Sequence, residues 1–505
     1  MRSGAITRAW HGSHANATAL LAGLALPLAF APFGLLPLAV LAPAVLFVLW
    51  ERASPAQALL RGWLFGLGLF GLGVSWVHES FQYSHVGTTV AVGLTALLVG
   101  FLASFPALAG YLAARIATGS QPVRLLLLLP AAWVLAEWTR GWFLTGFTWL
   151  QLGYSQLDSP LRGLAPLVGV YGVSWCVASL AGGLVLAVGK GRRALLIYFG
   201  AVLAVLAGSY GLERVQWTEA RDKAIQLALV QGNIPQELKW QPGARQRTVD
   251  RYFGLTREHW DAHLVVWPES SLPGFLHDFI PALAQLADEA EDHSPDILLG
   301  IDVLEGTTQQ YFNSVLALAP QTSFYHKRHL VPFAEYLPLE KVLRPLVDVL
   351  DLPVSRFSRG PPRQPPAQVA GEKVGISVCY EFAFGEEIIQ SLPQATLLVN
   401  VSNDAWFGDS IGPHQNLEMA RMRAVETGRY LARATNTGIT AVISPTGDIE
   451  ERLPQFEARV LRAEVYPMTG ATPYVRMGNI PVLMGLAAAL AVAGIGGWRT
   501  MNKPS

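Results

Sequence analysis

Cysteine is scarce in this sequence, which holds Cys176 and Cys379 and no other cysteine among its 505 residues. One lies inside an apolar run and the other lies far away in a charged region, so a disulfide framework is not expected. The spacings CxxC and HExxH are also missing. We therefore expect neither a bound metal nor an organic cofactor.

Charge is balanced overall but unevenly spread along the chain. The formal net charge is zero and no cluster of Lys and Arg interleaves with aromatic residues, so the sequence predicts no nucleic-acid binding. Only 15 of the 74 charged residues precede position 213. A long region with so little charge is typical of membrane proteins, and the length of the chain favours two or more structural units.

Long apolar runs account for this region. A membrane-spanning helix needs about 17 to 20 apolar residues, and seven runs before residue 213 and one near the C-terminus meet this length. Six spans follow the first run, which favours a retained anchor over a cleaved signal peptide. The sequence thus predicts eight transmembrane helices, at 16–33, 35–50, 57–77, 88–113, 122–138, 163–188, 194–211 and 479–498.

The short loops between these runs predict the orientation, because Lys and Arg mark the cytoplasmic side of a membrane protein. With alternating spans, one side collects Arg2, Arg8, Arg52, Arg61, Arg115, Arg124, Lys190, Arg192 and Arg193, together with Arg499 and Lys503 after the last run. The opposite loops carry few positive charges. Both termini are therefore expected in the cytoplasm, and the region from Arg214 to about Met477 is expected outside it.

The loop at 140–156, RGWFLTGFTWLQLGYSQ, is aromatic and nearly uncharged. We expect it to lie half buried in lipid, because aromatic side chains gather at the membrane interface. Contact between this loop and a lipid substrate is left as an open hypothesis.

From about residue 217 to 474 the pattern changes to short β-rich runs that alternate with amphipathic helices. Near-continuous apolar strands separated by helices predict an α/β fold in which helices cover a sheet. A helix is expected over 414–434. The expected strands lie in AIQLALVQGNIP, AHLVVWPES, DILLGIDVLE, YFNSVLALAP, KVGISVCYE and TLLVNVSNDAWF.

Three strand ends carry chemically active side chains. Glu269 follows LVVWP, Lys327 follows TSFYH, and Cys379 follows VGISV. Strands of this kind present functional groups at their carboxyl ends, so the three side chains can converge above a sheet. Taken singly, each has a structural explanation, since a lone Cys often packs as a small hydrophobe and a loop Glu or Lys is often a solvated charge.

The order and intervals of WPES, YHKRHLVPFAEYLP and SVCYE resemble the Glu-Lys-Cys triad of the nitrilase superfamily. Seven N-terminal spans and one C-terminal span around such a domain resemble one branch of it, the apolipoprotein N-acyltransferases. The segments VQGNIPQELKW and VSNDAWFGDSIGPHQN also fit that branch, so the resemblance covers nearly the whole chain. It implies transmembrane helices over 1–213, a periplasmic αββα sandwich domain over 214–476, and a last transmembrane helix and tail over 477–505.

The resemblance also implies an activity, the last step of bacterial lipoprotein maturation at the inner membrane. The donor would be a phospholipid such as phosphatidylethanolamine. The acceptor would be the α-amino group of the diacylglyceryl-modified cysteine at the N-terminus of an apolipoprotein. The acyl chain would pass through a thioester on the enzyme in two transfers, and we expect a monomer without a cofactor.

Within this family Glu269, Lys327 and Cys379 would form the catalytic triad. A free thiol has a pKa of ~8.5, so an adjacent base or cation must raise its thiolate fraction. Glu269 is suited to accept the thiol proton, while Lys327 would keep Glu269 ionised and stabilise an oxyanion. The resemblance also marks three further active-site residues and two possible substrate contacts: Glu335, Tyr380 and Glu381, and then Trp240, on a mobile arm, and Trp149.

For these further residues, other roles stay open. Glu335 would orient Lys327 or share the proton work, whereas Tyr380 could simply pack against the sheet and Glu381 could simply form an ion pair. The histidines are rivals for a Cys-His arrangement, although two of them flank Lys327 and the third suits a helix start: His326, His329 and His414.

Two other functions also remain open. A membrane-anchored amidase of the same superfamily would resolve the thioester with water instead of an amine, and the triad suits either reaction. A transporter or scaffold with an inactive sensor domain is less consistent with the few ionisable residues inside the spans, of which Glu137 is the nearest candidate.

Overall fold

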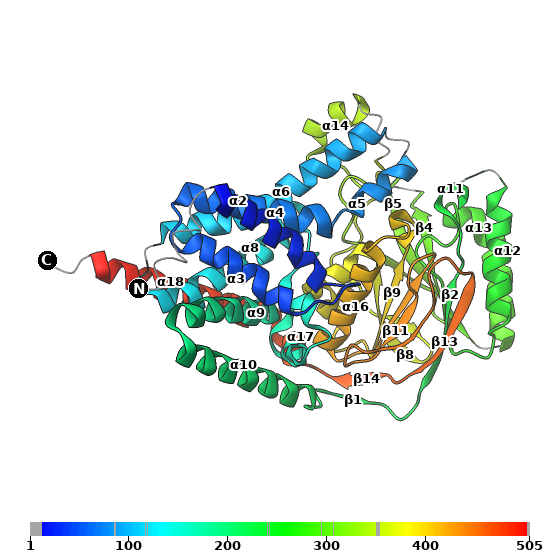
Figure 1. Cartoon of the computed structure of the whole chain (residues 1–505). Coiled ribbons are helices and arrows are strands. Elements are labelled where there is room, and N and C mark those ends of the chain that lie inside the picture. The colour runs from blue at the N-terminus through cyan, green and yellow to red at the C-terminus, as the bar shows by residue number, and fades with distance from the viewer. Residues whose placement is uncertain are drawn as a thin grey trace. The chain divides into compact units, whose positions relative to one another are not determined.

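The computed structural model describes residues 13–501, apart from 85–86, 117, 119, 240, 242, 294, 307 and 350–353. The chain forms two compact units, whose elements are labelled in Figure 1. The helical unit comprises Met1–His78, Thr88–Val215 and Met477–Ser505. The sandwich unit comprises Glu79–Gly87 and Gln216–Arg476.

Apolar helices make up the helical unit, as the scarcity of charge before residue 213 predicts. Four described helices are long and apolar enough to cross a membrane, and a bent pair, Pro55–Gly73 with Val77–Tyr83, would make a fifth. Three shorter apolar helices cover other predicted runs. The structure thus supports several membrane spans, while the number eight stays a prediction. The principal helices are α2 (Ser13–Ala25), α3 (Pro37–Glu51), α4 (Pro55–Gly73), α6 (Thr88–Arg115), α8 (Leu129–Arg140), α9 (Ala165–Lys190), α10 (Arg192–Glu213) and α18 (Ile480–Met501).

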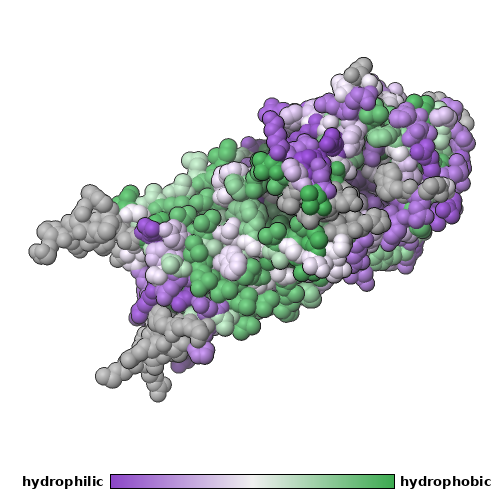
Figure 2. Space-filling model, turned by 90° about the horizontal axis from the view of Figure 1, so that it is seen from above, coloured by the Kyte–Doolittle hydropathy of each residue, from purple (hydrophilic) through white to green (hydrophobic). Residues whose placement is uncertain are grey.

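Large apolar side chains remain exposed on the surface of the helical unit. Leu97 is 72% exposed, Leu203 is 68% exposed and Met484 is 68% exposed. Figure 2 shows hydrophobic residues, in green, over much of the visible face of this unit. Soluble monomers rarely expose continuous apolar surface on this scale, whereas a surface that faces lipid requires it.

Two six-stranded sheets form the sandwich unit. The first sheet has the order β13-β2-β3-β4-β5-β6, and the second has the order β12-β11-β10-β9-β8-β7. Parallel pairings join β2 to β3 and β3 to β4 in the first sheet, and β8 to β9 and β9 to β10 in the second. The strands that carry the site are β2 (Ile225–Gln231), β3 (Leu264–Val266), β4 (Asp296–Leu304), β5 (Tyr311–Leu318), β6 (Ser323–His326), β8 (Glu372–Val378), β9 (Leu397–Ser402) and β10 (Leu431–Thr435).

The remaining strands are short or lie at the sheet edges. They are β7 (Ala367–Val369), β11 (Ala441–Ile443), β12 (Ile449–Arg452) and β13 (Arg459–Val465), with β1 (Thr218–Ala220) and β14 (Met468–Gly470) pairing separately. The sequence runs that predict β2, β3, β4, β5, β8 and β9 all contain strands. Their near-continuous burial is what strands covered on both faces require.

Helices cover the outer faces of the two sheets. The helices α12 (Ala244–Arg257) and α13 (Leu276–His293) pack against the first sheet through a core that includes Tyr252, Trp267 and Phe279. Figure 1 shows α12 and α13 on one side of the paired sheets and α16 (Gly412–Thr427) on the other. Buried side chains such as Val266 and Val401 fill the space between the sheets. The layers are therefore helix, sheet, sheet and helix.

One expected helix is confirmed but is shorter than predicted. The predicted helix over 414–434 ends at Thr427, because Gly428 adopts the left-handed conformation with a φ of 62° and closes the helix. The following residues form β10, which pairs in parallel with β9. In the sequence, Arg433 could belong to the polar face of an amphipathic helix. In the structure it is fully buried in this strand.

Candidate active site

The ends of strands from both sheets supply the candidate site. Glu269 lies three residues after β3, and Lys327 follows the last residue of β6, so both come from the first sheet. Cys379 follows the last residue of β8 in the second sheet. The structure brings these three sequence-predicted residues together, since Lys327 forms an ion pair with Glu269 and both interact electrostatically with Cys379.

Lys327 bridges two carboxylates. Its Nζ atom lies 3.1 Å from Glu269 Oε1 and 2.9 Å from Glu335 Oε1, and its side chain is 1% exposed. Asn313 Nδ2 donates to the same two oxygen atoms, at 2.7 and 3.0 Å. Val331 N donates to the remaining oxygen of Glu335 at 2.7 Å. Glu335 therefore shares the Lys327 ammonium with Glu269, and the two contacts together fix where the positive charge lies.

Glu269 is also tied to the second sheet. Asn403 N, just beyond β9, donates to Glu269 Oε2 at 2.9 Å. The Cys379 thiol lies near enough to interact electrostatically with the same carboxylate. One oxygen of Glu269 thus contacts the cation and Asn313, while the carboxylate as a whole remains within reach of the thiol proton. This arrangement is what a base for the thiol requires.

Cys379 sits on a strained turn. Its φ of 47° lies in the left-handed region, which non-glycine residues rarely adopt. The residue is partly exposed, unlike its neighbours Val378 and Tyr380, which are buried. Strain at a residue that presents a reactive atom is typical of functional sites, because the surrounding structure must enforce it.

Burial and the neighbouring charges together shift the pKa values of all three residues. Burial disfavours the ionised form of Glu269, but Lys327 and the hydrogen bond from Asn313 hold its pKa below the usual value. Burial also opposes the charge on Lys327, yet Glu269 and Glu335 hold its pKa well above the usual value. Burial and the nearby Glu269 carboxylate raise the pKa of the Cys379 thiol to about 12. The resting site therefore holds a carboxylate, an ammonium and a protonated thiol, and the thiol must lose its proton during the reaction.

Glu381 fastens the turn of Cys379 to the loop of Lys327. Its Oε2 atom accepts hydrogen bonds from Val378 N at 2.7 Å and from the Tyr325 hydroxyl at 2.9 Å. Its Oε1 atom accepts from Arg328 N at 2.8 Å and from His329 N at 3.1 Å. The ion-pair alternative for Glu381 thus does not describe its contacts, which are hydrogen bonds from three backbone N–H groups and one hydroxyl.

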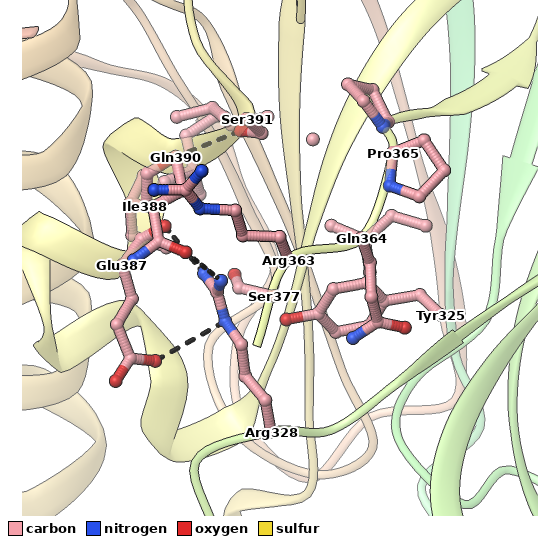
Figure 3. Close-up of a pocket in the computed structure, with 15 residues that line it drawn as sticks. Tyr325, Arg328, Arg363, Gln364, Pro365, Ser377, Glu387, Ile388, Gln390 and Ser391 are labelled. Carbon is pink, nitrogen blue, oxygen red and sulfur yellow. Dashed lines mark hydrogen bonds and ion pairs between the residues drawn. The ribbon is translucent and has the colours of Figure 1, made fainter. Parts of the chain in front are cut away.

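Arg328 secures the same loop from its other side. Its guanidinium donates to Gln390 Oε1 at 2.6 Å and to the carbonyl oxygen atoms of Glu387 at 2.6 Å and Pro362 at 2.7 Å. Figure 3 shows this side chain reaching toward Glu387 in a pocket that Tyr325 also lines. Arg328, which follows Lys327, is therefore held both through its backbone N–H and through its side chain.

Tyr380, His326 and His329 lie within two residues of Cys379 or Lys327 in the chain. Tyr380 is buried and packs edge to face on His329 and Phe384, with ring centroids 5.3 and 5.0 Å away. The ring nitrogen atoms Nδ1 of His329 and His326 contact Glu387 and Ser314. His414 lies in the first turn of α16.

The proposed substrate contacts are placed only in part. Trp240 lies outside the described residues. Trp149 is 4% exposed and packs on Trp76 and Phe147, with ring centroids 5.6 and 4.9 Å away. Its carbonyl oxygen accepts a hydrogen bond from Arg140 at 2.7 Å, which fixes the 140–156 loop to α8.

Comparison with known proteins connects this geometry to a family. The family model described as apolipoprotein N-acyltransferase N-terminal domain matches residues 22–183, and the model described as carbon-nitrogen hydrolase matches residues 226–474. The apolipoprotein N-acyltransferase of Methylococcus capsulatus is 48% identical over 478 residues, which cover 94% of this chain and 94% of that protein. This chain belongs to the apolipoprotein N-acyltransferase family. The family's proteins from Nitrosomonas europaea and Vibrio cholerae are 43% and 42% identical, and each alignment covers 94% of this chain and at least 95% of the relative.

Several buried polar residues of the sandwich unit were not identified from the sequence. Asn313 is a polar residue within the apolar strand YFNSVLALAP, and Asn403 lies in VSNDAWF. Asp404 forms a buried ion pair with Arg433 at 2.9 Å. A polar or charged residue inside or just after an otherwise apolar strand was the available signal in each case.

Proposed function

We propose that this chain is an apolipoprotein N-acyltransferase in which Glu269, Lys327 and Cys379 carry the chemistry. The observation that supports this most directly is the buried Lys327 ammonium between Glu269 and Glu335, beside a thiol on a strained turn. Membership of the family over nearly the whole chain supports the acyl-transfer reaction itself.

In the first half-reaction, the Cys379 sulfur attacks the ester carbonyl carbon of a phospholipid while Glu269 takes the thiol proton. A C–S bond forms and the ester C–O bond breaks, and the proton passes from Glu269 to the departing alcohol oxygen. The products are a thioester on Cys379 and a lysophospholipid. The raised pKa of the thiol is consistent with proton transfer during attack, since little thiolate exists beforehand.

In the second half-reaction, the α-amino group of the diacylglyceryl-cysteine of an apolipoprotein attacks the thioester. An N–C bond forms and the C–S bond breaks, Glu269 takes a proton from the nitrogen, and the sulfur recovers a proton. Lys327 would stabilise the oxyanion that develops on the carbonyl oxygen in both steps. Glu335 orients Lys327, Glu381 positions the turn, and Tyr380 packs beside the nucleophile.

The proposal includes a location. We propose eight transmembrane helices in the bacterial inner membrane, both termini in the cytoplasm, a periplasmic catalytic domain over 214–476, and a monomer. Both substrates carry acyl chains, whose transfer to water costs ~0.8 kcal/mol per CH₂ group. A catalytic unit carried on apolar helices would avoid this cost. Phosphatidylethanolamine is the proposed donor, and Trp149 and Trp240 are proposed substrate contacts.

The amidase alternative keeps the same thioester but discharges it with water. The test is to incubate the full-length protein in detergent with phosphatidylethanolamine that carries a labelled acyl chain, and to map the label by mass spectrometry. We expect a thioester on Cys379, no adduct in Cys379→Ala, and an unchanged adduct in the matched control Cys176→Ala. A diacylated lipopeptide should then discharge the adduct.

The possible results separate the alternatives. Equal labelling of Cys379→Ala would contradict the mechanism. Discharge at the same rate with and without the lipopeptide would favour the amidase.

A further inference from the structure

A row of buried polar side chains crosses the second sheet close to Cys379. Ser377 in β8 pairs with Asn400 in β9, and Asn400 pairs with Arg433 in β10, through the parallel register of these strands. Val401, the next residue after Asn400, points into the core between the sheets, so the alternation of side chains places the row on the outer face. Polar groups buried on such a face are costly unless they are bonded. The row therefore needs an explanation that the acyl-transfer mechanism above does not give.

Arg433 holds this row together. Its guanidinium donates to Asn400 Oδ1 and to the two carboxylate oxygen atoms of Asp404, at 3.1 and 2.9 Å. Asn400 Nδ2 donates in turn to Ser377 Oγ at 3.0 Å. The guanidinium also lies over the ring of Phe382, with Cζ 5.0 Å from the ring centroid. A planar guanidinium can contact an amide, a carboxylate and an aromatic face at once, whereas an ammonium acts as a single charged point.

These contacts reach the turn of Cys379 from both directions along the chain. Ser377 lies two residues before Cys379, and Phe382 lies three residues after it. The φ of 47° at Cys379 is a strained conformation, which persists only where the surrounding structure enforces it. Glu381 holds the backbone of this turn through Val378 N. The contacts of Arg433 restrain the residues that flank the turn.

The same guanidinium also reaches the proposed base. Asp404 directly follows Asn403, whose backbone N–H donates to Glu269 Oε2 at 2.9 Å. Asp404 Oδ1 accepts a further hydrogen bond from Ser402 Oγ at 3.0 Å, so the residues on both sides of Asn403 are bonded to each other. The position of this N–H, and with it the contact to Glu269, therefore depends on where Arg433 holds Asp404.

We propose that Arg433 is a positioning residue that sets the distance between the Cys379 sulfur and the Glu269 carboxylate. Its guanidinium holds the turn of the first residue and a hydrogen-bond donor of the second. This proposal rests on the proposed roles of Cys379 and Glu269. Arg433 acts through Phe382 and Asp404 instead of on the substrate, because its side chain is fully buried. Misplacement of reacting groups by ~1 Å can cost about 100-fold in rate, so such a role has a measurable effect.

The test is the rate of acyl-enzyme formation by the full-length protein in detergent, measured over a range of concentrations of labelled phosphatidylethanolamine. Arg433→Lys keeps a positive charge beside Asp404 but removes the planar group that also contacts Asn400 and Phe382. We expect the maximum rate to fall by about 10- to 100-fold. The phospholipid concentration that gives half of this rate should stay the same, because the buried guanidinium does not bind lipid.

Arg429→Lys is the matched control. Arg429 is also fully buried, and its guanidinium donates to the carbonyl oxygen atoms of Ala395 at 2.9 Å and Gly470 at 2.8 Å. It precedes β10, whereas the candidate site lies at the carboxyl ends of the strands. The same substitution should therefore lower the melting temperature without lowering the maximum rate of the folded protein. Equal losses of rate in the two variants, or no loss in Arg433→Lys, would overturn the proposal.

Hydrogen exchange separates local positioning from a general loss of structure. In Arg433→Lys, peptides that cover 377–384 and 400–404 should exchange faster than in the wild type, while peptides from β2 should be unchanged. Faster exchange throughout both sheets would overturn the proposal. If Arg433→Lys does not fold, Phe382→Leu removes the ring beneath the guanidinium and leaves the ion pair with Asp404 intact. It should lower the maximum rate several-fold, and an unchanged rate would overturn the proposal.

The wild-type protein separates this inference from the proposed function. If the wild type forms no thioester on Cys379, the proposed function fails. If the wild type forms the thioester and Arg433→Lys forms it at the same maximum rate, only the inference about Arg433 fails.

Discussion

The two sheets of the sandwich unit contribute to the candidate site in different ways. The first sheet supplies the proposed base Glu269 after β3 and the buried ammonium of Lys327 after β6. The second sheet supplies the proposed nucleophile Cys379 after β8 and the backbone donor Asn403 after β9. The proposed base and the proposed nucleophile therefore follow strands of different sheets, and contacts such as the hydrogen bond from Asn403 N to Glu269 join the two sides.

The charges on the two sides are arranged differently as well. On the first sheet, the carboxylates of Glu269 and Glu335 both contact the Lys327 ammonium, and both accept a hydrogen bond from Asn313. On the second sheet the buried Asp404 is already paired with Arg433, and Cys379 lies on a turn with a left-handed φ that the hydrogen bonds of Glu381 help to maintain. One side is thus sensitive to charge and the other to geometry, and substitutions can probe the two separately.

Removing the cation from the first sheet should have the largest effect. Lys327→Met leaves Glu269 and Glu335 buried without their shared ammonium, and breaking a buried pair in this way costs about 3–5 kcal/mol. We expect the melting temperature in detergent to fall and acyl-enzyme formation to be lost. Lys327→Arg, which retains the charge, should recover much of the stability. A Lys327→Met variant as stable as the wild type would contradict the assigned burial and pairing.

The contrast between the sheets also explains how far the sequence could predict the site. Glu269, Lys327 and Cys379 could be proposed because each stands just beyond the end of a strand, where functional groups of such sheets gather, and because their order resembles the Glu-Lys-Cys triad of a known family. Asn403 could not be connected with Glu269, because the two lie 134 residues apart and meet only when the sheets pack together. The proximity of Asp302 to Asn313 depends in the same way on the register of β4 and β5, which local patterns do not reveal.

Sequence patterns also predicted the fold only in part. Apolar runs predicted six strands and the layered class, because burial on both faces leaves a strong pattern. The helix expected over 414–434 ends early at Gly428, where a left-handed residue ends α16 and a buried strand begins. Arg433 in that strand is charged because it pairs with Asp404 inside the protein, a compensation that composition alone cannot show.

Substitution of Glu381, which links the turn after β8 to the loop after β6, should have a smaller effect. Glu381 accepts two hydrogen bonds at each oxygen, so in either orientation the amide group of Glu381→Gln would face two donors. Leaving buried donors unsatisfied costs about 1–3 kcal/mol, which should lower the melting temperature. The rate of acyl-enzyme formation should fall while the apparent affinity for phospholipid stays the same, because Glu381 positions the turn without lining the lipid. The exposed Glu451→Gln is the control, and equal behaviour of the two variants would contradict this role.

The smallest expected effect is on the alkylation rate of Cys379 when the Glu269 carboxylate is removed. Burial and then the Glu269 carboxylate raise the pKa of Cys379 to about 12, so a neutral alkylating reagent should label this thiol slowly up to high pH. Removing the negative neighbour in Glu269→Gln lowers the thiol pKa, since Lys327 remains to favour the thiolate, and each unit gives about tenfold more thiolate at a given pH. In a Cys176→Ala background, Glu269→Gln should therefore speed alkylation of Cys379 while it slows acyl transfer. If the substitution slowed both reactions, Glu269 would be holding the thiol in place instead of taking its proton, and the division of roles between the two sheets would not hold.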